Sequence, residues 1–230
     1  MKFYAVLFGL VLLPLTVSAE NEPYNRVDLQ VEVGREIAND LLLAQLGVEF
    51  QDKSPAQLAQ HINSAIHAAL KKAANYPAVK VSSGAQSTYP VYGKNNRLES
   101  WRGNARLRLE SRDFKAASEL IAQLQSAMLL SGVTFAVAPD TRQQAENTLV
   151  TEAIHAFDKR ADAVRTALNG EGYKFVHLNI NSSGNQYPQP MLARLAVNDT
   201  VATPEFAGGD SRITVQVSGT IEILTKQKQP

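Results

Sequence analysis

The sequence has no cysteine, almost no net charge and, beyond its first twenty residues, no long apolar run. Without a thiol, the chain has no cysteine nucleophile, thiol redox centre, cysteine-ligated zinc site or disulfide. Its 23 Lys and Arg residues are balanced by 22 Asp and Glu residues, so no basic surplus is left to neutralise nucleic-acid phosphates. We therefore expect neither cysteine chemistry nor nucleic-acid binding.

The rest of the composition is that of a folded protein. The chain has 230 residues, of which 44% are hydrophobic, which is enough for one fair-sized domain or two small ones. This apolar content, together with a net charge near zero, excludes an intrinsically disordered chain.

The N-terminus resembles an export signal. Lys2 precedes an apolar run over residues 3–17, and Val17-Ser18-Ala19 supplies the small residues that a signal peptidase reads. The alternative, a membrane anchor, needs a longer apolar run to cross about 30 Å of hydrocarbon. We expect cleavage after Ala19.

Cleavage there divides the chain into a signal peptide, residues 1–19, and a mature domain, residues 20–230. An exported protein without cysteine suits the bacterial periplasm, where an unpaired thiol is a liability. No segment of the mature part approaches eighteen consecutive apolar residues, so we expect no transmembrane helix after signal cleavage.

Alternation of apolar and polar residues predicts many strands, each with one dry and one wet face. The clearest case runs from Ile213 to Ile223, where every second residue is apolar or glycine. One-sided strands of this kind are typical of antiparallel sheets. The predicted strands cover residues 27–33, 42–50, 79–83, 103–109, 133–137, 176–180 and 213–223.

Three segments carry apolar residues at helical spacing behind a capping residue. Ser54-Pro55 opens the first helix and Pro139-Asp140-Thr141 opens the third, each with proline at the favourable first helical position. Ser111 or Asp113 caps the second helix, which we expect to end at Gly132.

These elements form two similar strand–helix–strand units, over residues 42–83 and 103–137. Turn residues fill the segment 89–96, and a long Pro- and Gly-rich loop is predicted at about residues 182–210. Loops of this length are usually functional, assembly-related or mobile. The predicted fold is α+β, with a curved, mainly antiparallel sheet covered on one face by three amphipathic helices.

Motifs that would mark an enzyme are missing from the sequence. It has no phosphate-binding glycine loop, no Gly-x-Ser-x-Gly elbow and no His-Glu-x-x-His zinc motif. Ser111 and Lys115 miss the Ser-x-x-Lys spacing by one residue. We assign no catalytic, cofactor-binding or metal-binding residue and expect a protein that is not an enzyme.

The four histidines do not suggest a shared site. His61 and His67 are six residues apart, about 240° around one helix, so they cannot hold a metal from one face. His155 has no second histidine within a helical turn. His177 lies on the polar side of its strand, where solvent exposure is favoured over a site.

Asp158 and Asp162 are one helical turn apart, a spacing that could bring two carboxylates together. Lys159, Arg160 and Arg165 lie close by in the sequence. Their charges favour a solvated helix face over a metal or acid–base pair.

The most distinctive charge feature is a row of arginines on the wet side of one strand: Arg102, Arg106 and Arg108. Such a row could hold an anionic ligand or the acidic edge of a partner. The alternative, which we favour, is cross-strand pairing with acidic neighbours such as Asp28 or Glu222.

The order of these segments resembles one family. Residues 101–109 read Trp-Arg-Gly-Asn-Ala-Arg-Leu-Arg-Leu, and Arg112-Asp113-Phe114 opens the next helix. An alanine-rich helix follows over residues 153–164, and residues 204–209 precede the last strand. In this order and spacing, nearly the whole mature chain resembles the SIMPL-domain family. The sequence departs from it at Asn39-Asp40, where the family usually has Pro-Asp.

The resemblance implies an α+β fold, a periplasmic location, large ring- or channel-like homo-oligomers and a loose link to envelope or oxidative stress. It implies no reaction and carries over no catalytic residue.

Two functions from different classes follow. The first is a non-enzymatic periplasmic protein that self-assembles, with the third helix and the loop at 182–210 as candidate contact surfaces. The second is a small-ligand (anion) binding module or a cryptic hydrolase that uses the arginine row or His177.

Overall fold

The computed structural model describes residues 24–182 and 207–225. The expected signal peptide and most of the loop predicted at 182–210 lie outside these residues. The described chain forms three α-helices, α1 (Pro55–Ala73), α2 (Phe114–Leu124) and α3 (Pro139–Ala167), and a 3₁₀ turn at Lys94–Asn96. It also forms the strands β1 (Arg26–Ala38), β2 (Leu41–Asp52), β3 (Val79–Tyr92), β4 (Leu98–Ser111), β5 (Leu129–Ala136), β6 (Gly172–Ser182) and β7 (Asp210–Leu224).

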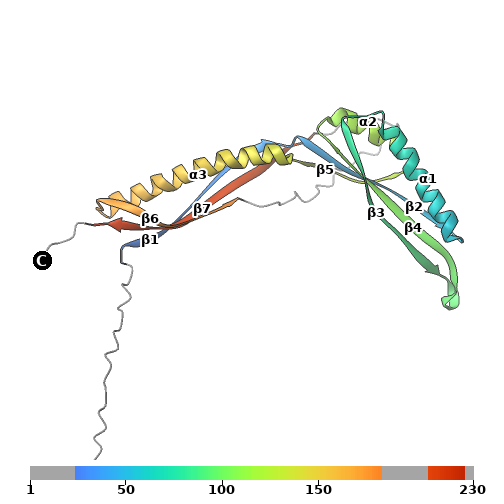
Figure 1. Ribbon diagram of the computed structural model, residues 1–230, viewed down its shortest axis with the longest axis horizontal. Helices are drawn as coiled ribbons and strands as arrows, with labels where there is room; N and C mark the ends of the chain where they lie inside the picture. Colours follow the sequence, from blue (N-terminus) through green and yellow to red (C-terminus); the bar gives the residue numbers. More distant parts are fainter. Residues whose placement is uncertain (1–23, 183–206, 226–230) are drawn as a thin grey trace, which may run out of the picture.

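The strands form two antiparallel sheets that lie end to end along the molecule (Figure 1). One sheet has three strands in the order β1-β7-β6, and α3 packs on it. The other has four strands in the order β3-β4-β2-β5, and α1 and α2 pack on it. The α+β class and the antiparallel pairing are thus confirmed, but the strands belong to two sheets and not to one curved sheet.

The division falls at Asn39-Asp40, between β1 and β2. β1 pairs with β7 over its whole length, from Arg26 opposite Glu222 to Ala38 opposite Asp210. β2 begins two residues later and pairs with β4 and β5 instead. The chain therefore passes from one sheet into the next without a turn, and each sheet has its own hydrophobic core.

The four-stranded half confirms the two strand–helix–strand units. The units β2-α1-β3 and β4-α2-β5 interlock so that β4 and β2 are central and β3 and β5 are the edges. This order is that of a split β-α-β, or ferredoxin-like, sheet. Both helices cover one face, so no described helix covers the opposite face of this sheet, which carries the polar side of β4.

The helices begin where the capping residues predict. The Ser54 hydroxyl accepts a hydrogen bond from the Gln57 N–H (3.4 Å), and the Asp113 carboxylate accepts one from the Ala116 N–H (2.9 Å). These side chains satisfy backbone donors that have no partner within the helix.

Two predicted boundaries are wrong. α2 ends at Leu124 rather than at Gly132, which instead lies in β5 beside a bulge against β2. The segment 89–96 is not all turn, because Tyr89 to Tyr92 continue β3 along β4. In both places pairing with a distant strand decides the structure.

Candidate functional site

The arginine row lies on the open face of the four-stranded sheet, as its alternation predicts. The Arg102 guanidinium lies 3.6 Å from the Glu49 carboxylate and donates a hydrogen bond to the Gln51 side chain (3.1 Å). Arg108 lies 3.3 Å from Glu110 on its own strand. Cross-strand pairing is therefore correct for Arg102, whose partners lie on β2, whereas Arg108 pairs within its own strand.

The partners are not the ones expected. Asp28 and Glu222 belong to the three-stranded sheet, where the Thr220 hydroxyl donates to Asp28 (2.6 Å). Glu222 pairs there with Arg26 (3.5 Å) and Lys174 (2.9 Å). Sequence alone does not say which strands share a sheet, so it could not choose between these carboxylates.

Arg106 differs from its two neighbours in the row. Within residues 24–182 and 207–225, no hydrogen bond or ion pair joins its exposed guanidinium to another side chain. In the register it lies opposite Gly47 of β2, and on the other side Gly84 of β3 approaches it. Arg106 therefore has a residue without a side chain on each neighbouring strand.

An open depression of about 490 Å³ adjoins Arg106. Its lining combines the polar side chains of Arg106, Asn104 and Ser131 with the apolar ones of Ala127 and Leu129. The complete lining consists of Gly47, Val48, Glu49, Phe50, Asn104, Ala105, Arg106, Ala127, Leu129 and Ser131.

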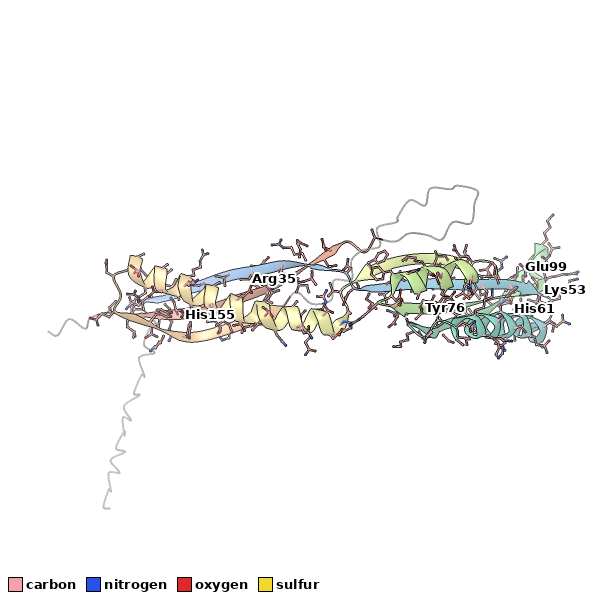
Figure 2. The ribbon with its side chains drawn as sticks, turned by 90° about the horizontal axis from the view of Figure 1, so that it is seen from above. Arg35, Lys53, His61, Tyr76, Glu99 and His155 are labelled. Atoms are coloured by element: carbon pink, nitrogen blue, oxygen red, sulfur yellow. The ribbon has the colours of Figure 1, made fainter. Side chains whose placement is uncertain are left out.

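The histidines do not form a shared site. His61 lies near the start of α1, where its Nδ1 is 3.9 Å from Asp52, whereas His155 lies on α3 in the other half (Figure 2). Among the residues that the structure describes, no three histidine or carboxylate side chains are placed to hold a metal ion.

His177 lies opposite Thr220, which in turn lies opposite Asp28, in a row across three strands. The row lines a shallow hollow. Because the Thr220 hydroxyl donates to Asp28, threonine and not histidine occupies the middle of the row. A nucleophilic triad needs the histidine between the hydroxyl and the carboxylate. In this row the three side chains do not stand in the order of such a triad.

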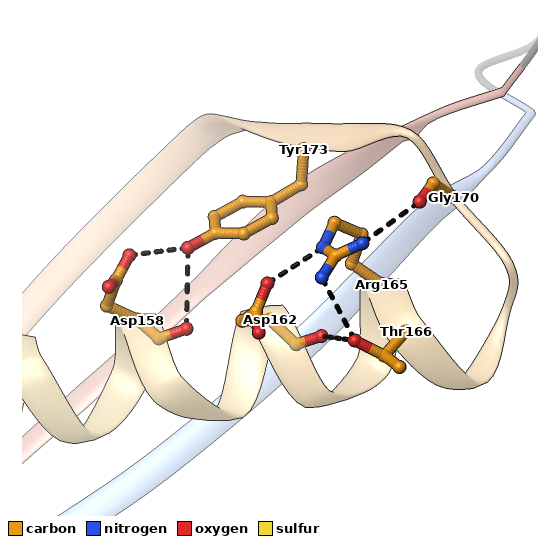
Figure 3. Close-up of polar contacts among 6 residues, drawn as sticks. All are labelled: Asp158, Asp162, Arg165, Thr166, Gly170 and Tyr173. Atoms are coloured by element: carbon orange, nitrogen blue, oxygen red, sulfur yellow. Dashed lines mark hydrogen bonds and ion pairs between the residues drawn. The ribbon is translucent and has the colours of Figure 1, made fainter.

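Asp158 and Asp162 each bind a different partner at the end of α3 (Figure 3). The Tyr173 hydroxyl donates to the Asp158 carboxylate (2.5 Å), and the Arg165 guanidinium donates to Asp162 (2.7 Å). Arg165 also donates to the Gly170 carbonyl (3.2 Å), so the contacts tie α3 to the start of β6. Each carboxylate therefore has a partner of its own in this structure.

Tyr173 was not recognised from the sequence as a partner of this helix. Its hydrogen bond to Asp158, together with partial burial and the negative charges of Asp158 and Asp162, raises the pKa of Tyr173 to about 12. The sequence signal that could have indicated this contact is a carboxylate in the last part of a helix, here Asp158, followed by an aromatic residue at the start of the next strand.

The link between the sheets forms a second polar cluster, also missed from sequence. The Asp40 carboxylate accepts hydrogen bonds from the Ala138 N–H and the Thr141 hydroxyl (both 2.6 Å), at the start of α3. Asn39 holds the start of β7 through its backbone N–H, which donates to the Gly209 carbonyl (3.0 Å). Asn39-Asp40, which stands where the family usually has Pro-Asp, therefore supplies polar contacts that join the two halves.

The free edge of β6 carries exposed apolar side chains. Within the described residues, β6 pairs only with β7, so its other edge has no strand partner. The exposed fractions are 51% for Phe175, 42% for Val176, 37% for Leu178 and 39% for Ile180. α3 covers β1 and β7 more fully than it covers this strand (Figure 1).

The fold and these surfaces define an elongated α+β protein with two antiparallel sheets and, among its described residues, no group of side chains placed to hold a metal ion. The SIMPL family, described as a protein family of unknown function (DUF541), matches residues 27–221. Because the match covers more than half of the sequence, the chain belongs to this family. No curated protein matches it. Among the described residues, none of the helices is long and apolar enough to cross a membrane.

Proposed function

We propose that the protein is a non-enzymatic periplasmic protein that assembles into homo-oligomers through the free edge of β6. The observation that carries this proposal is the row of exposed apolar side chains from Phe175 to Ile180 on that edge. An edge strand presents unpaired N–H and C=O groups that pair readily with another chain. Large exposed apolar side chains add the burial that makes such a contact stable.

The two edges of the three-stranded sheet differ in how well they are protected against pairing with another strand. β1 at the opposite edge carries Glu32, Arg35 and Glu36, charges of the kind that discourage edge pairing. β6 carries no charged residue from Phe175 to Ser182. The difference favours β6 as the contact strand.

The assembly is tested by the mass of the mature protein in light scattering behind a sizing column. Wild type should be a single large species, and Leu178→Lys should lower its mass because lysine resists burial at a strand contact. Leu70→Lys is the matched control, since Leu70 is similarly exposed (39%) but belongs to α1, the helix that packs on the other sheet. A monomeric wild type, or equal masses for the two variants, would overturn the proposal.

We further propose that the assembly is ring- or channel-like, and electron microscopy of the purified assembly tests this directly.

For the periplasmic location, the protein recovered from the periplasmic fraction should begin at Glu20 by mass spectrometry. For a role in envelope or oxidative stress, Leu178→Lys should fail to restore survival of a deletion strain under peroxide, whereas Leu70→Lys should restore it.

A further inference from the structure

The four-stranded sheet has an unfilled position next to β5. Pairing between β2 and β5 ends at Gly47 opposite Leu129, but β2 continues along β4 as far as Asp52. Residues 48–52 of β2 are therefore paired on one side only among the residues described. Backbone groups at such an edge need a partner, either water or another strand.

The depression beside Arg106 runs along this same edge. Val48, Glu49 and Phe50 of the unpaired segment line it, and Leu129, which is 76% exposed, lies at its end. A cleft with a strand edge, a few polar groups and an apolar rim is the kind of surface that receives an extended peptide.

The direction of the strands fixes which end of a peptide would meet Arg106. β5 is antiparallel to β2 and starts at Leu129. A peptide that continues the line of β5 along residues 48–52, also antiparallel to β2, ends with its C-terminus next to Leu129 and Gly47.

The groups around Gly47 suit a carboxylate. A side chain at Gly47 would have its Cβ 3.8 Å from the Arg106 Cγ and 4.0 Å from the Ser131 hydroxyl oxygen, so these two side chains border the space above the glycine. Arg106 carries a positive charge that no described carboxylate neutralises, unlike Arg102 and Arg108. Guanidinium and hydroxyl donors are those that bind carboxylates well.

We propose that this groove binds the C-terminal end of an extended peptide by strand addition, with Arg106 holding the terminal carboxylate. The backbone of residues 48–52 supplies the pairing, and Leu129 contacts an apolar side chain of the peptide. The proposal is independent of self-assembly, because β6 belongs to the other sheet.

The test uses a short fluorescein-labelled peptide of alternating threonine and valine, with either a free or an amidated C-terminus, in fluorescence anisotropy. Wild type should bind the free-carboxylate peptide, and amidation or Arg106→Gln should weaken binding about tenfold or more through loss of a charge-assisted hydrogen bond. Arg108→Gln, which changes a paired arginine on the same strand, should bind like wild type.

A second pair of variants tests the groove itself. Gly47→Val should abolish binding by filling the floor of the groove, and the fold should tolerate it because a Cβ there meets its nearest neighbours at ordinary distances of 3.5–4.0 Å. Gly132→Val is the control, since a Cβ there meets nothing within 4 Å. Unchanged binding in Leu178→Lys would separate this site from the assembly contact. No binding by wild type, equal binding of the amidated peptide, or wild-type binding by Arg106→Gln would overturn the proposal.

Discussion

The carboxylate of Asp40 accepts a hydrogen bond from the backbone N–H of Ala138, 98 residues further along the chain. Ala138 precedes α3 and has no side chain that could cap the helix, so Asp40 supplies the cap from the link between β1 and β2. An ion pair between Arg112 and Asp140 lies beside it. One carboxylate therefore fixes the start of α3 at the place where the two sheets meet.

Replacing Asp40 with Asn should lower the free energy of unfolding by about 1 kcal/mol at neutral pH, as the loss of a helix cap does. Burial alone would raise the pKa of Asp40, but the hydrogen bonds from Ala138 and Thr141 and the charge of Arg112 outweigh it and lower the pKa. The stabilisation is therefore present above the ordinary carboxyl pKa and is lost as the pH falls through the lowered value. Urea unfolding at pH 7 and at about pH 3 should show the difference between wild type and variant shrinking in acid.

Asp28→Asn provides the control for this prediction, because Asp28 also accepts a hydrogen bond but lies on the exposed face of β1. It should change the stability less than Asp40→Asn does. Equal effects of the two variants at neutral pH would show that Asp40 acts as an ordinary surface carboxylate.

The ultraviolet titration of tyrosine at 295 nm should contain one group that ionises at about pH 12, and Tyr173→Phe should remove it. Asp158→Asn should move this ionisation back toward the ordinary tyrosine pKa of about 10. Because the folded-state pKa is raised, the stability that Tyr173 contributes is complete below about pH 10 and is lost as the pH rises through 12. A titration of Tyr173→Phe that matches wild type above pH 11 would contradict the assignment.

Gly219→Ala should disturb β6 more than the addition of a single methyl group suggests. A Cβ at this position would lie 2.3 Å from the backbone carbonyl oxygen of His177, at the bulge where β6 pairs with β7. Backbone cannot yield as a side-chain end can, so β6 must shift, at a cost of about 1–3 kcal/mol in the free energy of unfolding.

Chemical denaturation measures this cost, with Gly132→Ala as the control because a Cβ there has free space. If β6 is the assembly strand, the mass of Gly219→Ala in light scattering should also fall. An unchanged stability would mean that β6 accommodates the extra methyl group without moving.

Local patterns predicted most of the elements but not their partners. The alternation from Ile213 to Ile223 depends on neighbouring residues alone, and β7 has the predicted buried face. The end of α2 was misplaced at Gly132, because residues from Leu129 onward pair with β2, which lies far away in the sequence. Propensity near the end of an element is weaker than such pairing.

The same limit applies to the candidate sites, where local patterns placed the residues but did not give their partners. The sequence located the arginine row on an exposed face, but it could not show that Arg102 and Arg108 pair with carboxylates while Arg106 pairs with none among the described residues. The spacing of Asp158 and Asp162 marked them as candidates. It could not indicate Tyr173 as the partner of Asp158, because that contact depends on how β6 returns along α3.

By itself, the sequence determined the α+β class, the cap of the first helix and the two strand–helix–strand units, because these follow from hydrogen bonds and periodicity within a few residues. Only the tertiary structure decided that the strands form two sheets, that Asp40 caps α3, and that the edges of β6 and of residues 48–52 have no strand partner within the described part of the chain. A strand's own alternation shows which of its faces is buried. Which strands become its neighbours, and which edges stay unpaired, depends on segments far apart in the chain.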